Sequence, residues 1–163
     1  MKKEYTILIV LILILGAYLF LHPENRDHYT LPEVPTIDLQ SVTGLVVEKD
    51  QARIRFSKTG TAWTVTDKEY PADEQMVTAI LDIFKHLTLT TLVSQKEDLH
   101  RYALDDSQKI SVKLLADETG VFELGIGKTA ATFNHTFVML PDDRNVYHAA
   151  GSLRPSVDKT VEQ

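Results

Sequence analysis

The sequence predicts an α+β domain in which antiparallel sheet is packed by one main amphipathic helix and by shorter helices. A single N-terminal transmembrane helix precedes this domain. Three patterns carry the prediction: an uncharged apolar run at 5–21, several short segments that alternate with period two, and a 3.6-residue apolar stripe at 73–87. We therefore expect a membrane anchor at 1–21, a spacer at 22–36 and an extracytoplasmic domain at 37–163.

The apolar run at 5–21 is about 25 Å long as a helix, at the short end of what crosses a hydrocarbon core of about 30 Å. Lys2 and Lys3 precede it, whereas the residues directly behind it contain one arginine, Arg26, against two acids, Glu24 and Asp27. Because basic flanks stay cytoplasmic, we expect a single-pass protein of the plasma (inner) membrane with a cytoplasmic N-terminus. The alternatives are a cleaved signal peptide, which needs an Ala-x-Ala site that is missing here, and a buried core helix.

Three prolines punctuate residues 22–36, namely Pro23, Pro32 and Pro35. Proline fixes the backbone φ angle and cannot donate a hydrogen bond, so the segment is typical of a stiff spacer. In the alternative interpretation, residues 31–35 form an ordered edge of the domain.

The domain begins with alternating segments at 45–48, 53–56 and 63–65, which predict an antiparallel meander. Asp73 then suits the N-cap of a helix, because its carboxylate can accept the free N–H groups of the first turn. The apolar stripe of this helix consists of Met76, Val77, Ile80, Ile83, Phe84 and Leu87.

A strand at 88–93 should follow, and Ser94 and Glu97 have the spacing of a capping box that would start a short helix through Tyr102. The remaining elements are strands at 110–114, 122–126, 133–139 and 146–148, a loop at 127–130 and a closing helix at 153–163. The order βββ-α-β-α-ββββ-α hints at two similar βββα-like halves.

The stretch from Trp63 to Val161 resembles the uncharacterised domain family DUF4340. The resemblance is carried by Trp63-Thr-Val65, Tyr70-Pro-Ala-Asp73, Tyr102-Ala-Leu104-Asp105, Leu124-Gly-Ile-Gly127-Lys128, the run from Phe137 to Tyr147, and Ser156-Val-Asp158. Where the family usually has Gly-Leu followed by proline, this chain has Ala103-Leu104 and no proline. The resemblance implies a membrane-associated, extracytoplasmic accessory role beside ABC-transporter and gliding-type components, and it supplies no catalytic residues.

Composition narrows the function further. The net charge of −6 argues against a nucleic-acid binder, and the chain has no cysteine with which to form disulfides. Gly127-Lys128-Thr129 resembles the end of a phosphate-binding loop, but position 122 is Phe and no helix follows, which argues against nucleotide binding. Gly125 and Gly127 instead favour a bulge or a tight turn at a strand end.

His135 and His148 flank a turn between two expected strands, and two imidazoles with a nearby carboxylate could bind zinc. They would face each other only across a two-residue loop, so we interpret them as ordinary sheet residues. His86 and His100 have no acidic or cysteine partner at ligand spacing.

The remaining chemistry-bearing residues also favour structural roles. We interpret the adjacent acids at 105–106, 117–118 and 142–143 as residues of solvated turns. The serines at 94, 107 and 152 do not lie in the sequence motif of a catalytic nucleophile. We expect the aromatic residues at 102, 133, 137 and 147 to be buried in the core. In the alternative interpretation they form a surface that binds a ligand or a partner. We predict no catalytic, cofactor-binding or metal-binding residues.

The sequence thus predicts a membrane-anchored accessory domain that binds a protein partner in a membrane complex and that is not an enzyme. The resemblance implies that this complex is an ABC-transporter-associated system. One alternative is a module for a small molecule, glycan or envelope lipid, which would need an apolar pocket between the 73–87 helix and the sheet. An envelope hydrolase is the third interpretation.

Overall fold

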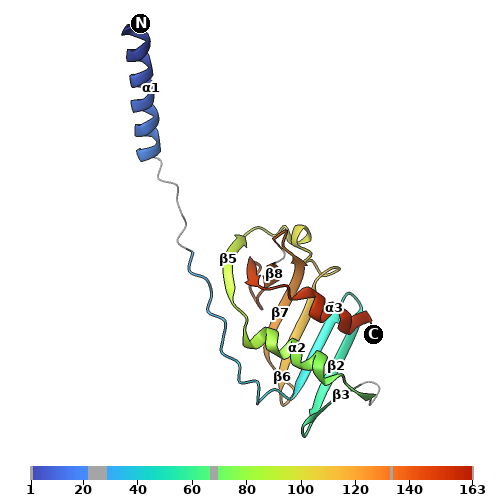
Figure 1. The fold of residues 1–163 in the computed structure, drawn as a ribbon. Coiled ribbons are helices and arrows are strands. Elements are labelled where there is room, and N and C mark those ends of the chain that lie inside the picture. Colours follow the sequence, from blue (N-terminus) through green and yellow to red (C-terminus); the bar gives the residue numbers. More distant parts are fainter. Residues whose placement is uncertain (1, 22–28, 67–69, 133, 163) are drawn as a thin grey trace. The chain divides into compact units, whose positions relative to one another are not determined.

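The computed structural model describes residues 2–21, 29–66, 70–132 and 134–162 (Figure 1). The chain divides into two units, Met1–Thr30 and Leu31–Gln163. The sequence-based expectations for Pro23 in the spacer and for Phe133 fall outside the described residues. Each unit is considered by itself below.

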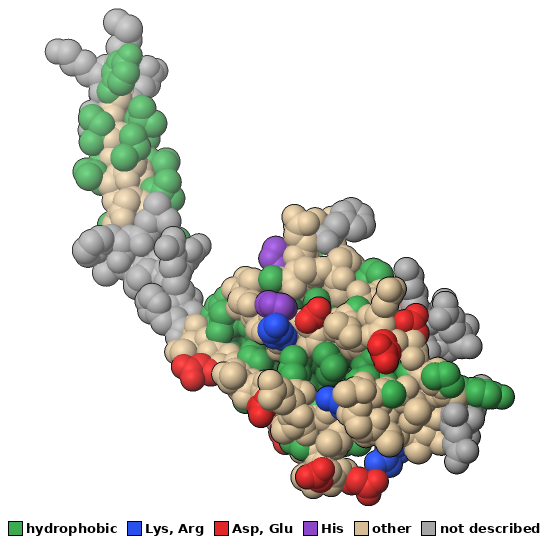
Figure 2. Space-filling view, turned by 60° about the horizontal axis from the view of Figure 1, so that its bottom comes forward, with side chains coloured by type: hydrophobic (Ala, Val, Ile, Leu, Met, Phe, Trp, Pro, Cys, Tyr) green, Lys and Arg blue, Asp and Glu red, His purple; other side chains and the backbone are tan. Residues whose placement is uncertain are grey.

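The N-terminal unit contains one helix, α1 (Lys2–Leu21). Every residue from Ile7 to Leu15 is a large aliphatic, and the exposed fractions of these side chains run from 49% at Val10 to 66% at Ile7. Figure 2 shows these green side chains protruding from both visible sides of the helix. Within the described residues, no helix has the combined length and hydrophobicity required of a membrane span.

The second unit is built on a nine-stranded antiparallel sheet with the order β4-β3-β2-β1-β6-β7-β8-β9-β5. The strands are β1 (Gly44–Lys49), β2 (Ala52–Thr59), β3 (Ala62–Val65), β4 (Tyr70–Pro71), β5 (Leu89–Ser94), β6 (Ile110–Ala116), β7 (Thr119–Thr129), β8 (His135–Met139) and β9 (Val146–Ala150). The α+β class and the opening meander of the prediction are confirmed.

Two similar halves can be traced in the connectivity. In each half four consecutive strands form a meander, β1–β4 and β6–β9, and a helix follows: α2 (Glu74–Lys85) after the first and α3 (Arg154–Glu162) after the second. The halves meet where β1 pairs with β6, and β5 is added at the edge beside β9. The expected βββα unit was therefore one strand short, because the two-residue β4 is too brief to show a periodic pattern.

The two helices cover one face of the sheet, which we call the inner face (Figure 1). From α2, Val77, Ile80, Ile83 and Phe84 are buried in a core shared with the inner side chains of the strands. The predicted N-cap is confirmed, because the Asp73 carboxylate accepts hydrogen bonds from the backbone N–H groups of Gln75 and Met76.

The domain unit starts before residue 37. Leu31, Val34, Ile37 and Leu39 are half-buried and pack against the core, although residues 31–39 form no strand. Residues 31–35 thus lie against the domain, as in the alternative interpretation in which they form its ordered edge. Apolar side chains two or three positions apart give the segment contacts with the core that its prolines do not prevent.

The predicted capping box at Ser94 is wrong. Ser94 ends β5, and its hydroxyl accepts a hydrogen bond from the backbone N–H of Lys96, whereas the Glu97 carboxylate pairs with Arg144. The short helix is the 3₁₀ helix η1 (Leu99–Tyr102), which starts four residues later than a Ser94 cap requires. Ser94 and Glu97 have the spacing of a capping box, but the Ser94 backbone is extended because it pairs with Val146 of β9.

The expected loop at 127–130 is also wrong, because β7 continues to Thr129. The pairing of β7 with β8 shifts register between Ile126 and Thr129, so a bulge lies at Gly127, as the glycine interpretation predicted.

The interpretation of Phe137 as a core residue is wrong, because strand β8 turns its other face to the core. Thr136 and Val138 are its fully buried inward residues, while Phe137 lies on the other face, which we call the outer face. The buried Thr136 hydroxyl donates to the Gly151 carbonyl and accepts from the Leu153 N–H, which satisfies its hydrogen-bonding capacity. Tyr147 is in the core as expected, at 4% exposure.

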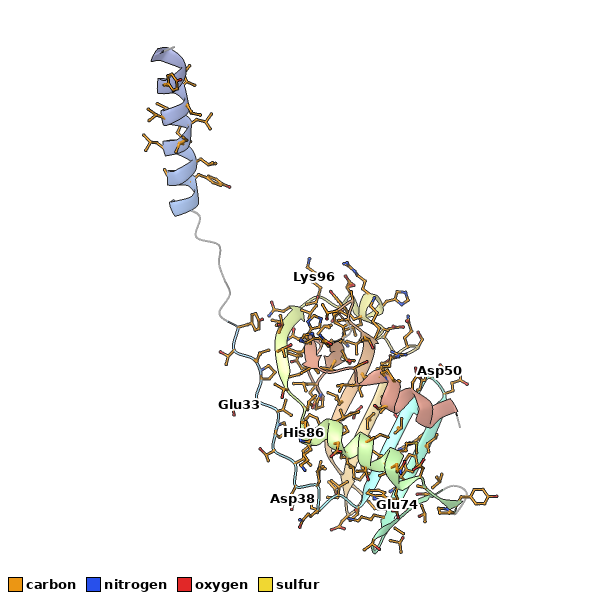
Figure 3. The ribbon with its side chains drawn as sticks, in the orientation of Figure 1. Glu33, Asp38, Asp50, Glu74, His86 and Lys96 are labelled. Atoms are coloured by element: carbon orange, nitrogen blue, oxygen red, sulfur yellow. The ribbon has the colours of Figure 1, made fainter. Side chains whose placement is uncertain are left out.

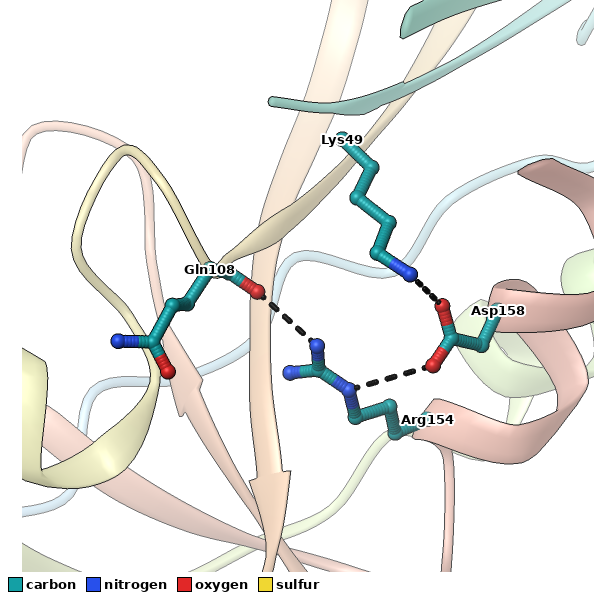
Figure 4. Close-up of polar contacts among 4 residues, drawn as sticks. All are labelled: Lys49, Gln108, Arg154 and Asp158. Atoms are coloured by element: carbon teal, nitrogen blue, oxygen red, sulfur yellow. Dashed lines mark hydrogen bonds and ion pairs between the residues drawn. The ribbon is translucent and has the colours of Figure 1, made fainter. Parts of the chain in front are cut away.

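Helix α3 is held to the sheet by a polar network as well as by the fully buried Val157 (Figure 4). Asp158 pairs through one oxygen with Lys49 of β1 and through the other with Arg154 Nε at 3.6 Å. Arg154 also donates from Nη2 to the Gln108 carbonyl at 3.0 Å. Asp158 thus joins α3 to β1, and Arg154, which it contacts, joins α3 to the segment before β6.

We predict that Asp158→Ala lowers the free energy of unfolding by about 1–2 kcal/mol, because it leaves the half-buried Lys49 and Arg154 without their carboxylate. Urea titration of the purified chain measures the change. Asp106→Ala is the matched control: it removes another Lys–Asp pair, but the Asp106 side chain is 96% exposed, so its effect should be much smaller than that of Asp158→Ala. Equal losses in the two variants would contradict the assigned role of Asp158.

Candidate functional site

The outer face of β8 and β9 carries four half-buried aromatic and imidazole side chains, Tyr102, His135, Phe137 and His148, which we call the outer-face cluster. Phe137 lies at its centre, with its ring centroid 4.9 Å from that of Tyr102 and 4.7 Å from that of His148. The His135 and His148 centroids are 5.4 Å apart. Alternation places these strand residues away from the core, since their neighbours Thr136, Val138, Tyr147 and Ala149 face inward.

The cluster depends on a close approach between η1 and β7. A Cβ atom on Gly127 would lie 2.3 Å from the Tyr102 carbonyl oxygen and 2.9 Å from Leu104 Cγ. Only glycine leaves room for the backbone at this point. Leu104 is fully buried here and does not belong to the main core cluster. The segment after η1 therefore covers part of the outer face and positions Tyr102.

The register decides how the two histidines meet. Phe137 pairs with His148 and His135 pairs with Ala150, so the histidines are diagonal neighbours and not directly opposite. The loop between β8 and β9 spans 140–145, longer than the two residues that direct opposition would require. From the sequence we expected a loop longer than two residues to separate the histidines, but diagonal neighbours on one face of a sheet are still within reach of each other.

The environment of His148 disfavours its charged form. Burial lowers its pKa below the usual value, and the neighbouring His135 lowers it further. Its Nε2 atom is inaccessible to solvent and has no hydrogen-bond partner. His135 differs, because its Nδ1 lies 3.4 Å from the Thr132 hydroxyl.

No group of three or more His, Cys, Asp or Glu side chains in the described residues could hold a metal ion together. The described residues therefore place no carboxylate beside His135 and His148 that could complete a zinc site. His100 does have an acidic neighbour, contrary to expectation, since its Nδ1 lies 3.7 Å from Asp105 Oδ1. The turn after η1 brings these two side chains together.

A cavity of about 360 Å³ opens on the outer face next to the β8–β9 loop. Its walls combine Ser111, Glu123, Gly125 and Met139 of the strands with residues 140–144. The alternative prediction of a pocket between α2 and the sheet is wrong in its location, because buried side chains of the core fill that space.

Most of the charged groups around this cavity are already paired. Glu123 accepts from the Ser111 hydroxyl at 2.7 Å, and Arg144 pairs with Glu97 at 2.6 Å. The Tyr147 hydroxyl donates to Asp143 at 2.7 Å, and burial together with this carboxylate raises the Tyr147 pKa. The cavity therefore offers few unpaired groups to a ligand.

The adjacent acids lie in turns, as predicted, and do not converge. Asp117, Glu118 and Asp142 have positive φ angles typical of tight turns. In the turn after η1, Asp105 accepts from the Ser107 hydroxyl, which lowers the Asp105 pKa. Figure 3 shows that Glu33, Asp38, Asp50 and Glu74 are also spread over separate parts of the domain.

A family model described as "Domain of unknown function (DUF4340)" matches residues 63–163. The chain belongs to the DUF4340 family. No curated protein and no solved structure matches it. The matched region of this DUF4340 member begins in β3 and includes α2, the second meander, the outer-face cluster and α3.

One departure of this member from the family pattern has a structural consequence. Ala103, at the position where the pattern usually has glycine, caps η1 in the left-handed conformation with φ 54°. A residue with a Cβ atom is strained there, by roughly 1 kcal/mol. The backbone N–H of Ala103 nevertheless donates to the His100 carbonyl, which keeps the turn closed beneath Tyr102.

We predict that Gly127→Ala destabilises the domain by at least about 2 kcal/mol, because the added methyl group meets the Tyr102 carbonyl and the backbone must move. Gly125→Ala is the control in the same strand, since its Cβ would make ordinary contacts of 3.5 Å with Met139. Thermal unfolding of both variants measures the difference. If Gly127→Ala were as stable as Gly125→Ala, the close approach of η1 to β7 would be disproved.

We also predict that the domain loses stability as the pH falls from 6.5 through the lowered pKa of His148. The unfolded chain binds a proton there more readily than the folded one, so this contribution to stability is complete above pH 6.5 and decreases below it. Urea midpoints in the presence of a chelator at pH 7.5 and 5 test this. His148→Gln should flatten the dependence, while His86→Gln, at an exposed site, should leave it unchanged.

Proposed function

We propose that this DUF4340 protein is a membrane-anchored accessory subunit that displays its α+β domain outside the cytoplasm to bind a protein of a membrane complex. The observation that carries the proposal is α1, whose described side chains from Ile7 to Leu15 are all aliphatic and all about half exposed or more. A helix that is apolar on every side requires apolar surroundings.

The energetic argument favours lipid as those surroundings. Complete burial of one Ile, Leu or Val side chain contributes about 1.5–3 kcal/mol, so the run from Ile7 to Leu15 would gain more than about 10 kcal/mol. The helix satisfies its own backbone hydrogen bonds, as the bilayer interior demands. In the sequence the apolar run extends through Leu21, beyond the residues whose side chains are described.

The orientation rests on the flanking charges. Lys2 and Lys3 precede the apolar run, and positively charged flanks stay on the cytoplasmic side. The domain would then be extracytoplasmic, and the absence of cysteine from the chain is compatible with an oxidising compartment.

A binding role is favoured over a catalytic one by the distribution of reactive groups. General acid–base catalysis needs groups that converge on one reacting atom. The acid pairs lie in separate turns, and the hydroxyls of Ser94, Ser107 and Ser111 form hydrogen bonds that stabilise local structure. The outer-face cavity is the best place for a small ligand, but most of its charged groups already have partners. For these reasons we favour a protein partner over a small molecule, glycan or lipid.

The proposal predicts that the protein stays in the membrane pellet after an alkaline carbonate wash. Replacing Leu11 and Ile12 by Lys should release it, because charges at the centre of a short span are costly. Topology can be read directly, since the chain contains no cysteine of its own. A cysteine at the exposed Thr78 should react with a membrane-impermeant maleimide in spheroplasts, whereas one at Glu4 should react only after lysis.

Release of the unmodified chain by carbonate, or the reverse labelling pattern, would overturn the proposed location. The partner-binding part is tested separately, by purification of the full chain in mild detergent. A stoichiometric membrane protein should co-purify, and recovery of the chain alone would count against an accessory subunit.

A further inference from the structure

We propose that His135 and His148 form a two-nitrogen binding site for a divalent transition metal, with Cu²⁺ bound more tightly than Zn²⁺. The site would lie on the outer face of the domain between β8 and β9. It goes beyond the proposed function, because it does not depend on the membrane anchor or on a protein partner.

The separation of the rings fits a shared metal. A metal–nitrogen bond of about 2.1 Å places the metal about 3 Å from each imidazole centre, and a tetrahedral angle between the two bonds then separates the centres by about 5 Å. The observed separation of the centroids is 5.4 Å, with 31° between the ring planes. The register of the two strands holds both imidazoles on the same face of the sheet as diagonal neighbours.

The hydrogen-bonding state of each ring leaves a nitrogen for the metal. When His135 donates from Nδ1 to the Thr132 hydroxyl, its lone pair is on Nε2. This kind of contact orients imidazole ligands in metal sites. His148 Nε2 is buried and has no partner, and such an atom costs free energy that a metal bond would recover.

The two imidazole ligands determine which metal ions the site can bind. Neutral imidazoles are ligands for Zn²⁺, Ni²⁺ and Cu²⁺, while Mg²⁺ and Ca²⁺ prefer oxygen. In the described residues no third His, Cys, Asp or Glu joins the pair, so the remaining positions would be open to water or to a group from another molecule. With the same two nitrogens, affinity should rise from Zn²⁺ to Cu²⁺.

The packing around His148 keeps the site defined. Phe137 contacts one side of the His148 ring, and Tyr102 packs against Phe137. These aromatic neighbours restrict the ring without supplying a competing ligand.

The test uses the full chain in detergent, freed of metal and titrated with Cu²⁺ or Zn²⁺ at pH 7.5. We expect one Cu²⁺ site whose electron paramagnetic resonance spectrum shows coupling to two imidazole nitrogens, and a weaker Zn²⁺ site by calorimetry. His135→Gln and His148→Gln should each remove this spectrum and lower Cu²⁺ affinity at least tenfold.

His86→Gln and His100→Gln are the matched controls, because each removes one exposed imidazole elsewhere in the domain and should leave the spectrum unchanged. Circular dichroism checks that every variant is folded. If either site variant fails to fold, the wild-type spectrum and the proton chemical shifts of His135 and His148 on Zn²⁺ addition decide the matter. A wild-type spectrum without two-nitrogen coupling, or coupling that survives in both site variants, overturns the proposal.

Discussion

The antiparallel pairing of β1 with β6 is the interaction on which the domain depends. It joins the two meanders, and its cross-strand pairs Leu45–Leu114 and Val47–Val112 consist of fully buried side chains. The first meander is local in sequence, and so is the second, but this pairing links residues more than sixty positions apart. Its contacts therefore close the largest loop in the sheet, and the burial of both strands must offset the entropy of that closure.

Helix α3 reinforces the same junction from the inner face. It contacts β1 and β2 of the first half and β6 and β7 of the second. Val157 supplies the apolar contact, and Asp158 adds a bond to Lys49 at the end of β1. Because the family model extends over the second half and α3, the DUF4340 region includes the helix that holds the two halves together.

The two faces of the sheet have different roles. Among the described residues, the inner face is covered by α2 and α3, whose buried side chains share its core. The outer face is covered only in part, by the segment after η1, and there the outer-face cluster and the cavity remain half exposed. The features from which binding is proposed thus lie where the fold does not need them for its core.

Much of the fold follows from the sequence because its causes are local. Periodicity predicted the meander and α2, Asp73 predicted the N-cap, and the ordered motifs predicted the family. The apolar run at 5–21 also gives the reason to expect a membrane anchor. By contrast, the orientation of β8 could not be read from its alternating residues. Both of its faces carry apolar side chains, and the buried Thr136 is compensated only by partners fifteen or more positions away.

Only the tertiary structure decided the order of the strands, the role of Gly127 and the meeting of the two histidines. Strand order depends on contacts between distant segments, which no local pattern records. Gly127 is required because the Tyr102 carbonyl, far away in sequence, approaches it. His135 and His148 meet because the register of β8 and β9 makes them diagonal neighbours on one face, and a register is set by the packing of whole strands.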